Sequence, residues 1–233
     1  MSREAILGAI RRGLRRGALP EDQATALRAR LAAHPRHLIP ARSRLPRPQQ
    51  VALFLANLAR EYATAARVPA DDAVPGAVGD YLAAQNLPPA FVMAPHPELR
   101  ALPWGEWPLL TRREGCAAAD DAVSVQHGFA GIAETGTLLL PSGAARPTTL
   151  NLLCETAIVV LRASRVVGAY EEAFDLLRAE QARDGRDVLP PRNVMLVTGP
   201  SRSADIESVL ELGAHGPRRL HVVLVDDDPA ARA

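Results

Sequence analysis

The basic residues of this chain include no lysine, because all 27 of its Lys+Arg residues are arginines. A lysine Schiff base is therefore excluded as a catalytic device. A phosphate-binding loop of the Walker A type is excluded for the same reason, since such a loop needs its lysine to reach the phosphates.

Cysteine is scarce as well, with Cys116 and Cys154 far apart in the sequence. Two thiolates are too few for a four-cysteine zinc site or an iron–sulfur cluster, and a disulfide is disfavoured in a reducing compartment. We expect both residues to be ordinary thiols in or near the core. Any iron–sulfur chemistry would then belong to a partner protein.

Long apolar runs and a strong excess of one charge are also missing. No stretch approaches the roughly 20 apolar residues that cross a bilayer, and residues 1–16 lack the apolar centre of a secretion signal. We therefore expect a cytoplasmic protein without a membrane span. Lys+Arg 27 against Asp+Glu 26 gives a net charge of +1, which offers no electrostatic case for a nucleic-acid partner.

The first third of the chain has helical periodicity. Apolar residues recur on one helical face in residues 3–15 and again in residues 21–33. A proline- and arginine-rich connector follows and ends at Pro48. From a length of 233 residues we expect an N-terminal helical segment with its connector over residues 1–48, and an α/β domain over residues 49–233.

That domain is expected to open with a helix over residues 49–66. Val51, Phe54, Leu55, Leu58 and Tyr62 would form its buried stripe.

Short apolar runs and helical segments alternate through the rest of the chain. Such an alternation predicts strands buried on both faces, and hence a mostly parallel sheet. The expected strands are residues 90–93, 122–125, 137–140, 157–161, 194–197 and 220–225, and the expected helices are residues 77–84, 169–183 and 204–212.

A glycine-rich segment, residues 128–137, combines conformational freedom with polar groups. Its glycines allow tight turns and close approach of the backbone to a ligand. Glu134, Thr135 and Thr137 stand at the start of a predicted strand, where they could position an organic acid or a phosphate. The alternative is a hairpin whose polar residues satisfy their own backbone.

A second polar segment, residues 197–207, follows one predicted strand and is expected to open a helix. Ser201 or Ser203 would cap that helix, and Asp205 would suit the positive end of its dipole. A helix N-terminus flanked by Arg202 could bind an anion at the carboxyl end of the sheet. The alternative is a well-capped helix with nothing bound.

The histidines give weaker signals. His215 lies between two glycines and could act as an acid or a base, although Gly213 is better explained as a helix cap. His127 is a similar candidate beside the glycine-rich segment. His96 and the other histidines show no metal-ligand spacing, so no metal is predicted.

Both polar segments resemble the two signatures of the lactate-utilization protein C (LUD domain) family. Residues 131–137 read Gly-Ile-Ala-Glu-Thr-Gly-Thr, and residues 198–207 read Thr-Gly-Pro-Ser-Arg-Ser-Ala-Asp-Ile-Glu. The similarity extends from about residue 91 to residue 226. The chain departs from the family pattern at Cys154, where a proline is usual, and near Ala157, where a histidine is usual.

The resemblance implies a Rossmann-like, mostly parallel sheet of the ribose-5-phosphate isomerase and coenzyme A transferase type. It also implies a non-redox component of a system that oxidises L-lactate to pyruvate, with iron–sulfur clusters on partner proteins and no cofactor on this chain. Glu134 resembles the coenzyme A transferase carboxylate in position. The catalytic candidates are therefore Glu134, from this resemblance, and His215, from its place between two glycines. The expected ligand-binding residues are Gly131, Glu134, Thr135, Gly136, Thr137, Gly199, Ser201, Arg202 and Asp205.

We thus expect a component that binds an organic acid or another small anion. Two alternatives stay open at this point. The chain could be a stand-alone isomerase or transferase acting on a sugar phosphate or a coenzyme A thioester, or a purely structural subunit.

Overall fold

A computed structural model of the chain describes residues 2–15, 17–183, 191–206 and 209–228. The chain divides into two compact units, Met1–Leu38 and Ile39–Ala233. The first unit contains two helices, α1 (Arg3–Gly13) and α2 (Glu21–Ala33), which confirms both predicted helices. The side chain of Ser2 caps α1 by accepting a hydrogen bond from the backbone N–H of Ala5.

The second unit is built on a six-stranded sheet in which every neighbouring pair of strands is parallel. The strand order is β1-β12-β7-β4-β2-β3. The strands are β1 (Thr64–Val68), β2 (Ala90–Met93), β3 (Thr111–Glu114), β4 (Val123–His127), β7 (Thr156–Arg162) and β12 (Arg219–Val225). The predicted parallel α/β sheet is therefore confirmed.

A second sheet has four strands in the order β8-β5-β6-β9. It consists of β5 (Ala130–Ile132), β6 (Thr137–Pro141), β8 (Val166–Val167) and β9 (Val194–Val197). Strand β6 runs antiparallel to both β5 and β9, whereas β8 runs parallel to β5. The remaining strands, β10 (Arg202–Ile206) and β11 (Val209–Leu212), pair antiparallel with each other.

Helices and short 3-10 turns connect these strands. The α-helices are α3 (Arg47–Arg60), α4 (Val74–Ala84), α5 (Pro97–Arg100) and α6 (Tyr170–Arg183), and the turns are η1 (Ala41–Ser43), η2 (Asp71–Ala73), η3 (Trp104–Glu106), η4 (Thr148–Asn151) and η5 (Ala163–Arg165). Among the described residues, no helix is long and apolar enough to cross a membrane.

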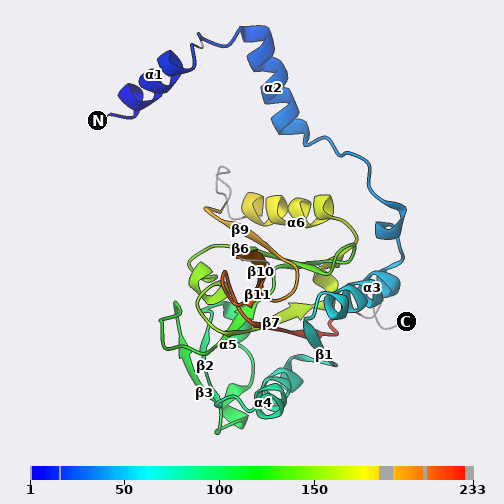
Figure 1. Cartoon of the computed structure of the whole chain (residues 1–233). Helices are drawn as coiled ribbons and strands as arrows, with labels where there is room; N and C mark the ends of the chain where they lie inside the picture. The colour runs from blue at the N-terminus through cyan, green and yellow to red at the C-terminus, as the bar shows by residue number, and fades with distance from the viewer. Residues whose placement is uncertain (1, 16, 184–190, 207–208, 229–233) are drawn as a thin grey trace. The chain divides into compact units, whose positions relative to one another are not determined.

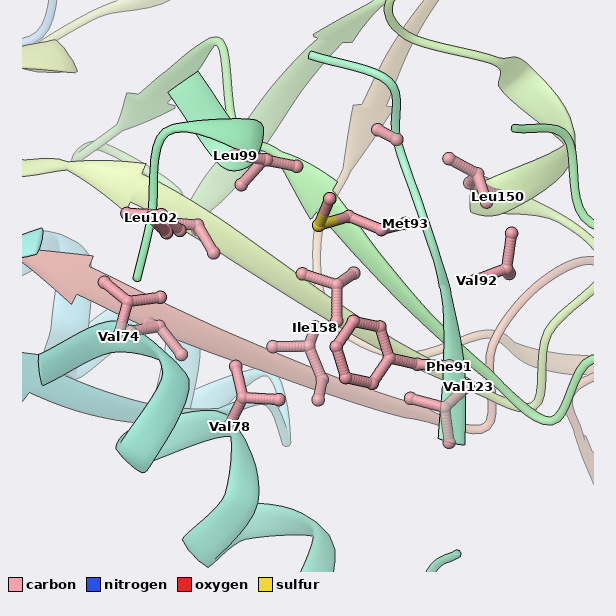
Figure 2. Packing of buried hydrophobic residues seen from close by; sticks show 14 of the residues in the cluster. Val74, Val78, Phe91, Val92, Met93, Leu99, Leu102, Val123, Leu150 and Ile158 are labelled. Carbon is pink, nitrogen blue, oxygen red and sulfur yellow. The ribbon is translucent and has the colours of Figure 1, made fainter. Parts of the chain in front are cut away.

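Three apolar clusters stack the second unit into layers (Figure 1). The first joins α4 to one face of the six-stranded sheet; Val74, Val78, Phe91, Met93 and Ile158 belong to it (Figure 2). The second joins the opposite face of that sheet to α3 and β6, and the third joins the four-stranded sheet to α6. The alternation of side chains along a strand explains how β7 and β12 contribute to both of the first two clusters.

Helix α3 ends earlier than the periodicity suggested. Tyr62 has a left-handed φ of 65°, the N–H of Ala63 donates to the carbonyl of Leu58, and the N–H of Tyr62 donates to that of Ala59. This pattern is a Schellman C-cap, which ends the helix and lets β1 begin at Thr64. Tyr62 is consequently 72% exposed, so its assignment to the buried stripe was wrong, whereas that of Val51 and Phe54 is confirmed.

The predicted helix over residues 204–212 was wrong. That segment forms part of the β10–β11 hairpin, with Arg202 opposite Leu212 and Ile206 opposite Val209. Nine residues can satisfy both helical and strand patterns, so tertiary pairing decides between them. Gly213 therefore follows a strand instead of capping a helix.

The two thiols differ in their surroundings. Cys154 is buried in the first apolar cluster, as expected, but Cys116 is exposed, so its expected place in or near the core was wrong. Both cysteines are free thiols.

Candidate functional site

The first signature forms the hairpin between β5 and β6. Gly131 lies within β5, and Thr137 begins β6. The carboxylate of Glu134 accepts hydrogen bonds from Arg42 Nη2 at 2.8 Å and from Ser43 Oγ at 3.1 Å. Both carboxylate oxygens are thus engaged, and they hold the connector turn η1 against the hairpin.

The hydroxyl groups of the first signature form a network that reaches the second signature. Thr137 Oγ1 lies 2.6 Å from Thr135 Oγ1 and 2.6 Å from Thr198 Oγ1. The hydroxyl of Tyr170 lies 2.9 Å from Thr135 Oγ1 and 3.0 Å from Thr137 Oγ1. The structure therefore brings the two signatures together through these four hydroxyls.

Both signatures also pack against the C-terminal half of α3. A Cβ on Gly136, whose φ is +68°, would lie 2.7 Å from the backbone of Asn57, and a Cβ on Gly199, whose φ is +78°, would lie 2.2 Å from the carbonyl oxygen of Glu61. Arg202 pairs with the Glu61 carboxylate at 3.2 Å and covers the ring of Tyr62 at 4.4 Å. Close backbone approach to α3 is a sufficient reason for both glycines.

These contacts correct the expected anion site at a helix N-terminus. No helix begins after Ser201, because β10 starts at Arg202, and the preceding strand β9 belongs to the four-stranded sheet. Ser201 Oγ accepts a hydrogen bond from the backbone N–H of His215, whose own side chain is exposed. Asp205 lies in β10, so its expected place at a helix N-terminus was wrong. Glu207 and the side chain of Asp205 lie outside the described residues, so ligand binding by Asp205 stays a prediction.

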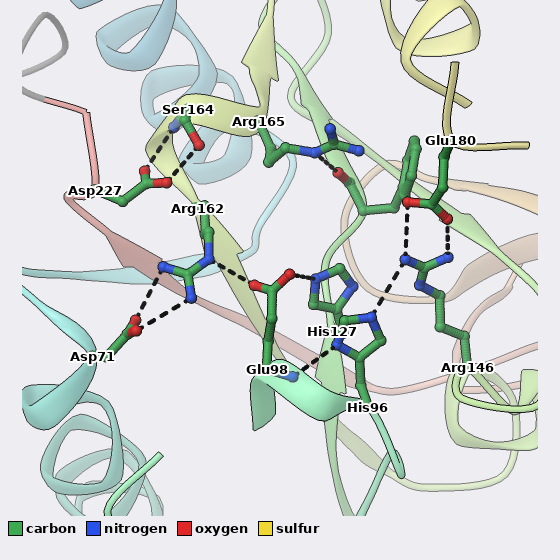
Figure 3. Close-up of polar contacts among 11 residues, drawn as sticks. Asp71, His96, Glu98, His127, Arg146, Arg162, Ser164, Arg165, Glu180 and Asp227 are labelled. Carbon is green, nitrogen blue, oxygen red and sulfur yellow. Dashed lines mark hydrogen bonds and ion pairs between the residues drawn. The ribbon is translucent and has the colours of Figure 1, made fainter. Parts of the chain in front are cut away.

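A different group of charged residues collects where the parallel strands end, at the sheet edge where α/β proteins bind ligands (Figure 3). Each comes from the last residue of a strand or from the turn after it. The group includes Asp71 after β1, His96 and Glu98 after β2, His127 at the end of β4, Arg162 at the end of β7, Arg165 in η5 and Asp227 after β12.

Two histidines form the centre of this group. The rings of His96 and His127 stack with their centroids 3.6 Å apart and an interplanar angle of 16°. The sequence placed the two residues far apart, but β2 and β4 are parallel neighbours that end side by side. In the sequence, the signal for this pair was a polar residue shortly after each of two apolar runs, residues 90–93 and 122–125.

His96 is buried and faces two hydrogen-bond donors. The backbone N–H of Glu98 lies 3.3 Å from its Nδ1, and Arg146 Nη2 lies 3.4 Å from its Nε2. Burial, the adjacent His127 and the charge of Arg146 lower the pKa of His96 to about 4. The ring is therefore neutral at pH 7.

Glu98 connects the histidine pair to an arginine. Its Oε1 lies 3.5 Å from His127 Nε2, and its Oε2 accepts a 2.6 Å hydrogen bond from Arg162 Nε. Arg162 also pairs with Asp71, at 3.1 Å and 3.2 Å. The contacts with His127 and Arg162 hold the pKa of Glu98 well below its ordinary value, so this carboxyl group is ionised.

Two further arginines flank the other side of the pair. Arg146 pairs with Glu180 through both terminal nitrogens, at 2.7 Å and 3.3 Å. The guanidinium carbons of Arg146 and Arg165 lie 5.2 Å and 4.4 Å from the ring centroid of Phe129. Burial lowers the pKa of Arg165, as expected for a cation held in part away from water.

A small cavity with room for about one water molecule adjoins this charged group and is lined by His127, Arg146 and Asn151. Each of these three residues has one buried polar atom without a hydrogen-bond partner in the described part of the chain. The atoms are His127 Nδ1, Arg146 Nε and Asn151 Oδ1. Buried polar atoms normally have partners, so their grouping around one cavity points to a ligand or bound water.

A second cavity lies next to the first, since Gln126, Leu140 and Asn151 line both. Gly199 and Pro200 of the second signature line it, as does the buried Ala157. Ala157, near the position where the resemblance leads one to expect a histidine, places a small side chain at this cavity wall. The second signature contributes backbone to this region.

His96, Glu98 and His127 are also the described residues that come close enough to share a metal ion, with ligand atoms within 4.8 Å of one another. A shared metal needs convergent lone pairs, whereas stacked rings direct their lone pairs along nearly parallel lines. The cationic Arg146 beside His96 opposes a metal as well. That this chain holds no metal stays a prediction.

The buried histidines predict a pH dependence of stability. Burial lowers the pKa of His96 and of His221 from 6.5 to about 4, so between these values the unfolded chain takes up protons that the folded chain does not. We expect the free energy of unfolding to fall as the pH drops through this interval and to be insensitive to both groups above it. Urea unfolding at pH 7 and pH 5 measures the effect.

His221→Gln should reduce this pH dependence, because it removes one of the two groups. His34→Gln, at an exposed position in the N-terminal unit, is the matched control and should leave the dependence unchanged. Equal pH profiles for His221→Gln and the wild type would contradict the prediction.

The fold and the site define a mixed α/β protein with a mostly parallel central sheet and a charged cluster at the carboxyl edge of that sheet. Residues 114–225 match the LUD domain family. The match covers just under half of the chain, and it confirms the resemblance found in the sequence.

Similar proteins agree with this assignment. Lactate utilization protein C of Bacillus velezensis is 33% identical over 127 residues, which are 54% of this chain and 52% of that protein. The protein of the same name from Bacillus subtilis is 33% identical over 126 residues, 54% and 51% of the two chains. The matched region thus spans about half the length of these relatives.

A solved structure shares the fold. The crystal structure of a DUF162 family protein from Deinococcus radiodurans superposes with a TM-score of 0.56 at 23% identity, and the match covers 78% of this chain and 99% of that chain.

Proposed function

We propose that this chain takes part in lactate utilization as a non-redox component that binds a small organic acid. The LUD domain and the names of the relatives support the pathway. Iron–sulfur proteins would be the partners that hold the redox centres, because two cysteines, one buried and one exposed, cannot supply such a cluster.

The organic acid would bind at the mouth of the cavity beside the histidine pair, because the cavity itself has room for about one water molecule. The observation that carries this proposal is the group of three unpartnered atoms, His127 Nδ1, Arg146 Nε and Asn151 Oδ1, on residues that line one cavity. An Arg N–H suits a carboxylate, and two polar atoms remain for a second functional group. Arg165 adds positive charge nearby.

The residues of the two signatures would support the fold around this site and would not contact the ligand. Both carboxylate oxygens of Glu134 already accept hydrogen bonds from Arg42 and Ser43, and Arg202 pairs with Glu61 beside α3. The same pairing of Glu134 disfavours the isomerase or transferase alternative, in which that carboxylate would be base or nucleophile.

The structural-subunit alternative has one observation in its favour. Gly136 and Gly199 of the two signatures are accounted for by packing against α3 alone. Under this alternative the signatures would serve the fold, and the cavity would hold only ordered water.

Growth on L-lactate as the sole carbon source tests the proposal, in a strain deleted for the gene and without a second lactate oxidase. We expect the wild-type gene to restore growth and Arg146→Ala to fail, because the substitution removes the donor for the carboxylate. Arg100→Ala is the matched control, since Arg100 is exposed and pairs with Glu114; it should restore growth.

Equal soluble levels and thermal melts of the variants are checked in parallel. Normal growth of the deletion strain on lactate would contradict the role in lactate utilization. Full complementation by Arg146→Ala would remove this cavity from the site and favour the structural alternative.

A further inference from the structure

We propose that helix α1 binds the surface of an anionic phospholipid bilayer, with its apolar face in the headgroup region and its arginines attracted by the lipid phosphates. An 11-residue helix is about 16 Å long. This is too short to cross the roughly 30 Å core of a bilayer, so the proposal concerns the bilayer surface alone. It is independent of the proposed role in lactate utilization.

One face of α1 is apolar and exposed to water. Successive residues of a helix are turned by about 100°, which places Ile6, Leu7, Ile10 and the C-cap residue Leu14 within an arc of about 100°. These four residues are the apolar face of α1. Ile6, Ile10 and Leu14 are 47%, 51% and 59% exposed. Covering this face would therefore remove apolar surface from water, which is favourable.

The helix also lacks the packing that ordinarily stabilises a short helix. Isolated helices below about 12 to 15 residues are marginal in water, and most helices in proteins are stabilised by packing of an amphipathic face. All 11 residues of α1 are described, and none of them is buried. A surface that covers the apolar face would supply the missing packing, so surface binding and helix formation would reinforce each other.

Arginines gather at the C-terminal end of α1. Arg11 and Arg12 lie in its last turn, and Arg15 follows the helix. Residues 3–15 contain four arginines against one glutamate, which gives a net charge of +3. Within the described part of the chain, Arg11, Arg12 and Arg15 form no ion pair. Their charges are therefore available to an anionic surface, and a basic amphipathic helix of this kind is typical of membrane-surface segments.

The next helix in the sequence, α2, differs in both respects. Its two acidic residues balance its two arginines, and Arg28 pairs with Glu21 at 2.9 Å. Its large apolar residues are only two, Leu27 and Leu31. Because α2 is an exposed helix of the same unit without a separate basic and apolar face, it provides matched controls for α1.

A lipid surface fits α1 better than a groove on a protein. Arg12 lies opposite the apolar face, so a groove that holds this face would leave Arg12 outside. A charged bilayer attracts cations without direct contact, over a Debye length of about 8 to 10 Å. Since a helix with its side chains is about 10 to 12 Å wide, Arg11 and Arg12 both lie within this range when the apolar face rests on the bilayer.

Flotation of the full chain with lipid vesicles tests the proposal. One set of vesicles contains phosphatidylcholine alone, and the other contains phosphatidylglycerol and phosphatidylcholine in equal parts. We expect the wild type to bind the mixed vesicles at least about tenfold more tightly than the neutral ones. This preference should largely disappear at about 1 M salt, where the Debye length is about 3 Å.

Two variants of α1 separate the apolar contribution from the electrostatic one. Ile10→Ser removes the centre of the apolar face and should weaken binding to the mixed vesicles at least about fivefold. Arg11→Gln/Arg12→Gln should weaken it about thirtyfold, since each arginine near an anionic surface contributes roughly a factor of five.

The corresponding changes in α2 are the controls. Leu31→Ser alters a side chain that is 74% exposed, and Arg28→Gln/Arg30→Gln removes the same charge as the double variant of α1. Both should bind the mixed vesicles as the wild type does. Because α1 and α2 contain no buried residue, we expect all four variants to keep the thermal midpoint of the wild type.

Loss of vesicle binding in the α1 variants alone would support the proposal. Equal losses in the α1 and α2 variants would overturn it, because net charge would then explain the binding. Absence of wild-type binding to the mixed vesicles would also overturn it, and would favour a groove on a protein partner as the surface that covers α1.

Discussion

Replacement of Phe54 by alanine is expected to lower the free energy of unfolding by about 3 to 5 kcal/mol. Phe54 lies on α3, is 0% exposed, and belongs to the cluster between the six-stranded sheet and β6. Its ring also lies directly on the second sheet, because a Cβ on Gly131 would meet it at 2.9 Å. Removing the ring leaves a cavity where α3 meets both sheets. The fall in the free energy of unfolding therefore combines the lost burial of the apolar ring with the lost contacts of the atoms around the cavity.

Urea unfolding at pH 7 measures the loss. Leu109→Ala is the matched control, since Leu109 is 82% exposed and its truncation should change the free energy of unfolding by less than about 0.5 kcal/mol. A loss below about 1 kcal/mol for Phe54→Ala would show that α3 is not held between the two sheets as described.

Gly199→Ala is expected to destabilise the protein by about 2 to 5 kcal/mol. Two causes act together. The residue has a φ of +78°, which an alanine adopts at a cost, and the added Cβ would lie 2.2 Å from the Glu61 carbonyl oxygen. The backbone of the second signature must then move away from α3.

The thermal midpoint of Gly199→Ala, compared with that of Gly105→Ala, isolates this strain. A Cβ on Gly105 would meet nothing within 4 Å, and no left-handed φ constrains it, so its midpoint should stay near that of the wild type. Equal midpoints for the two variants would mean that the second signature does not pack on α3. The glycine would then have to be explained by a ligand.

The sequence predicted most of the secondary structure because the relevant signals are local. The periodicity of residues 3–15 and 21–33 specified α1 and α2, and apolar runs specified strands such as β7 and β12. The segment around β10 and β11 failed, since its short pattern suited both structures and long-range pairing chose the hairpin.

The signatures were found from the sequence, but their chemistry was not. Glu134 looked like a ligand or a base until the structure placed Arg42, 92 positions away, on its carboxylate. Arg202 looked like an anion clamp until Glu61, 141 positions away, paired with it. Composition shows which charges exist, whereas only the fold shows which of them neutralise each other.

The sequence by itself thus determined the α/β class, the resemblance to the LUD domain family and the absence of lysine chemistry, because these depend on local pattern and composition. Only the tertiary structure decided the site. His96 and His127 meet because β2 and β4 are parallel neighbours, and Arg146 joins them from the loop after β6. Strand order is set by the burial of whole faces against α3, α4 and the second sheet, and no short stretch of sequence contains that information.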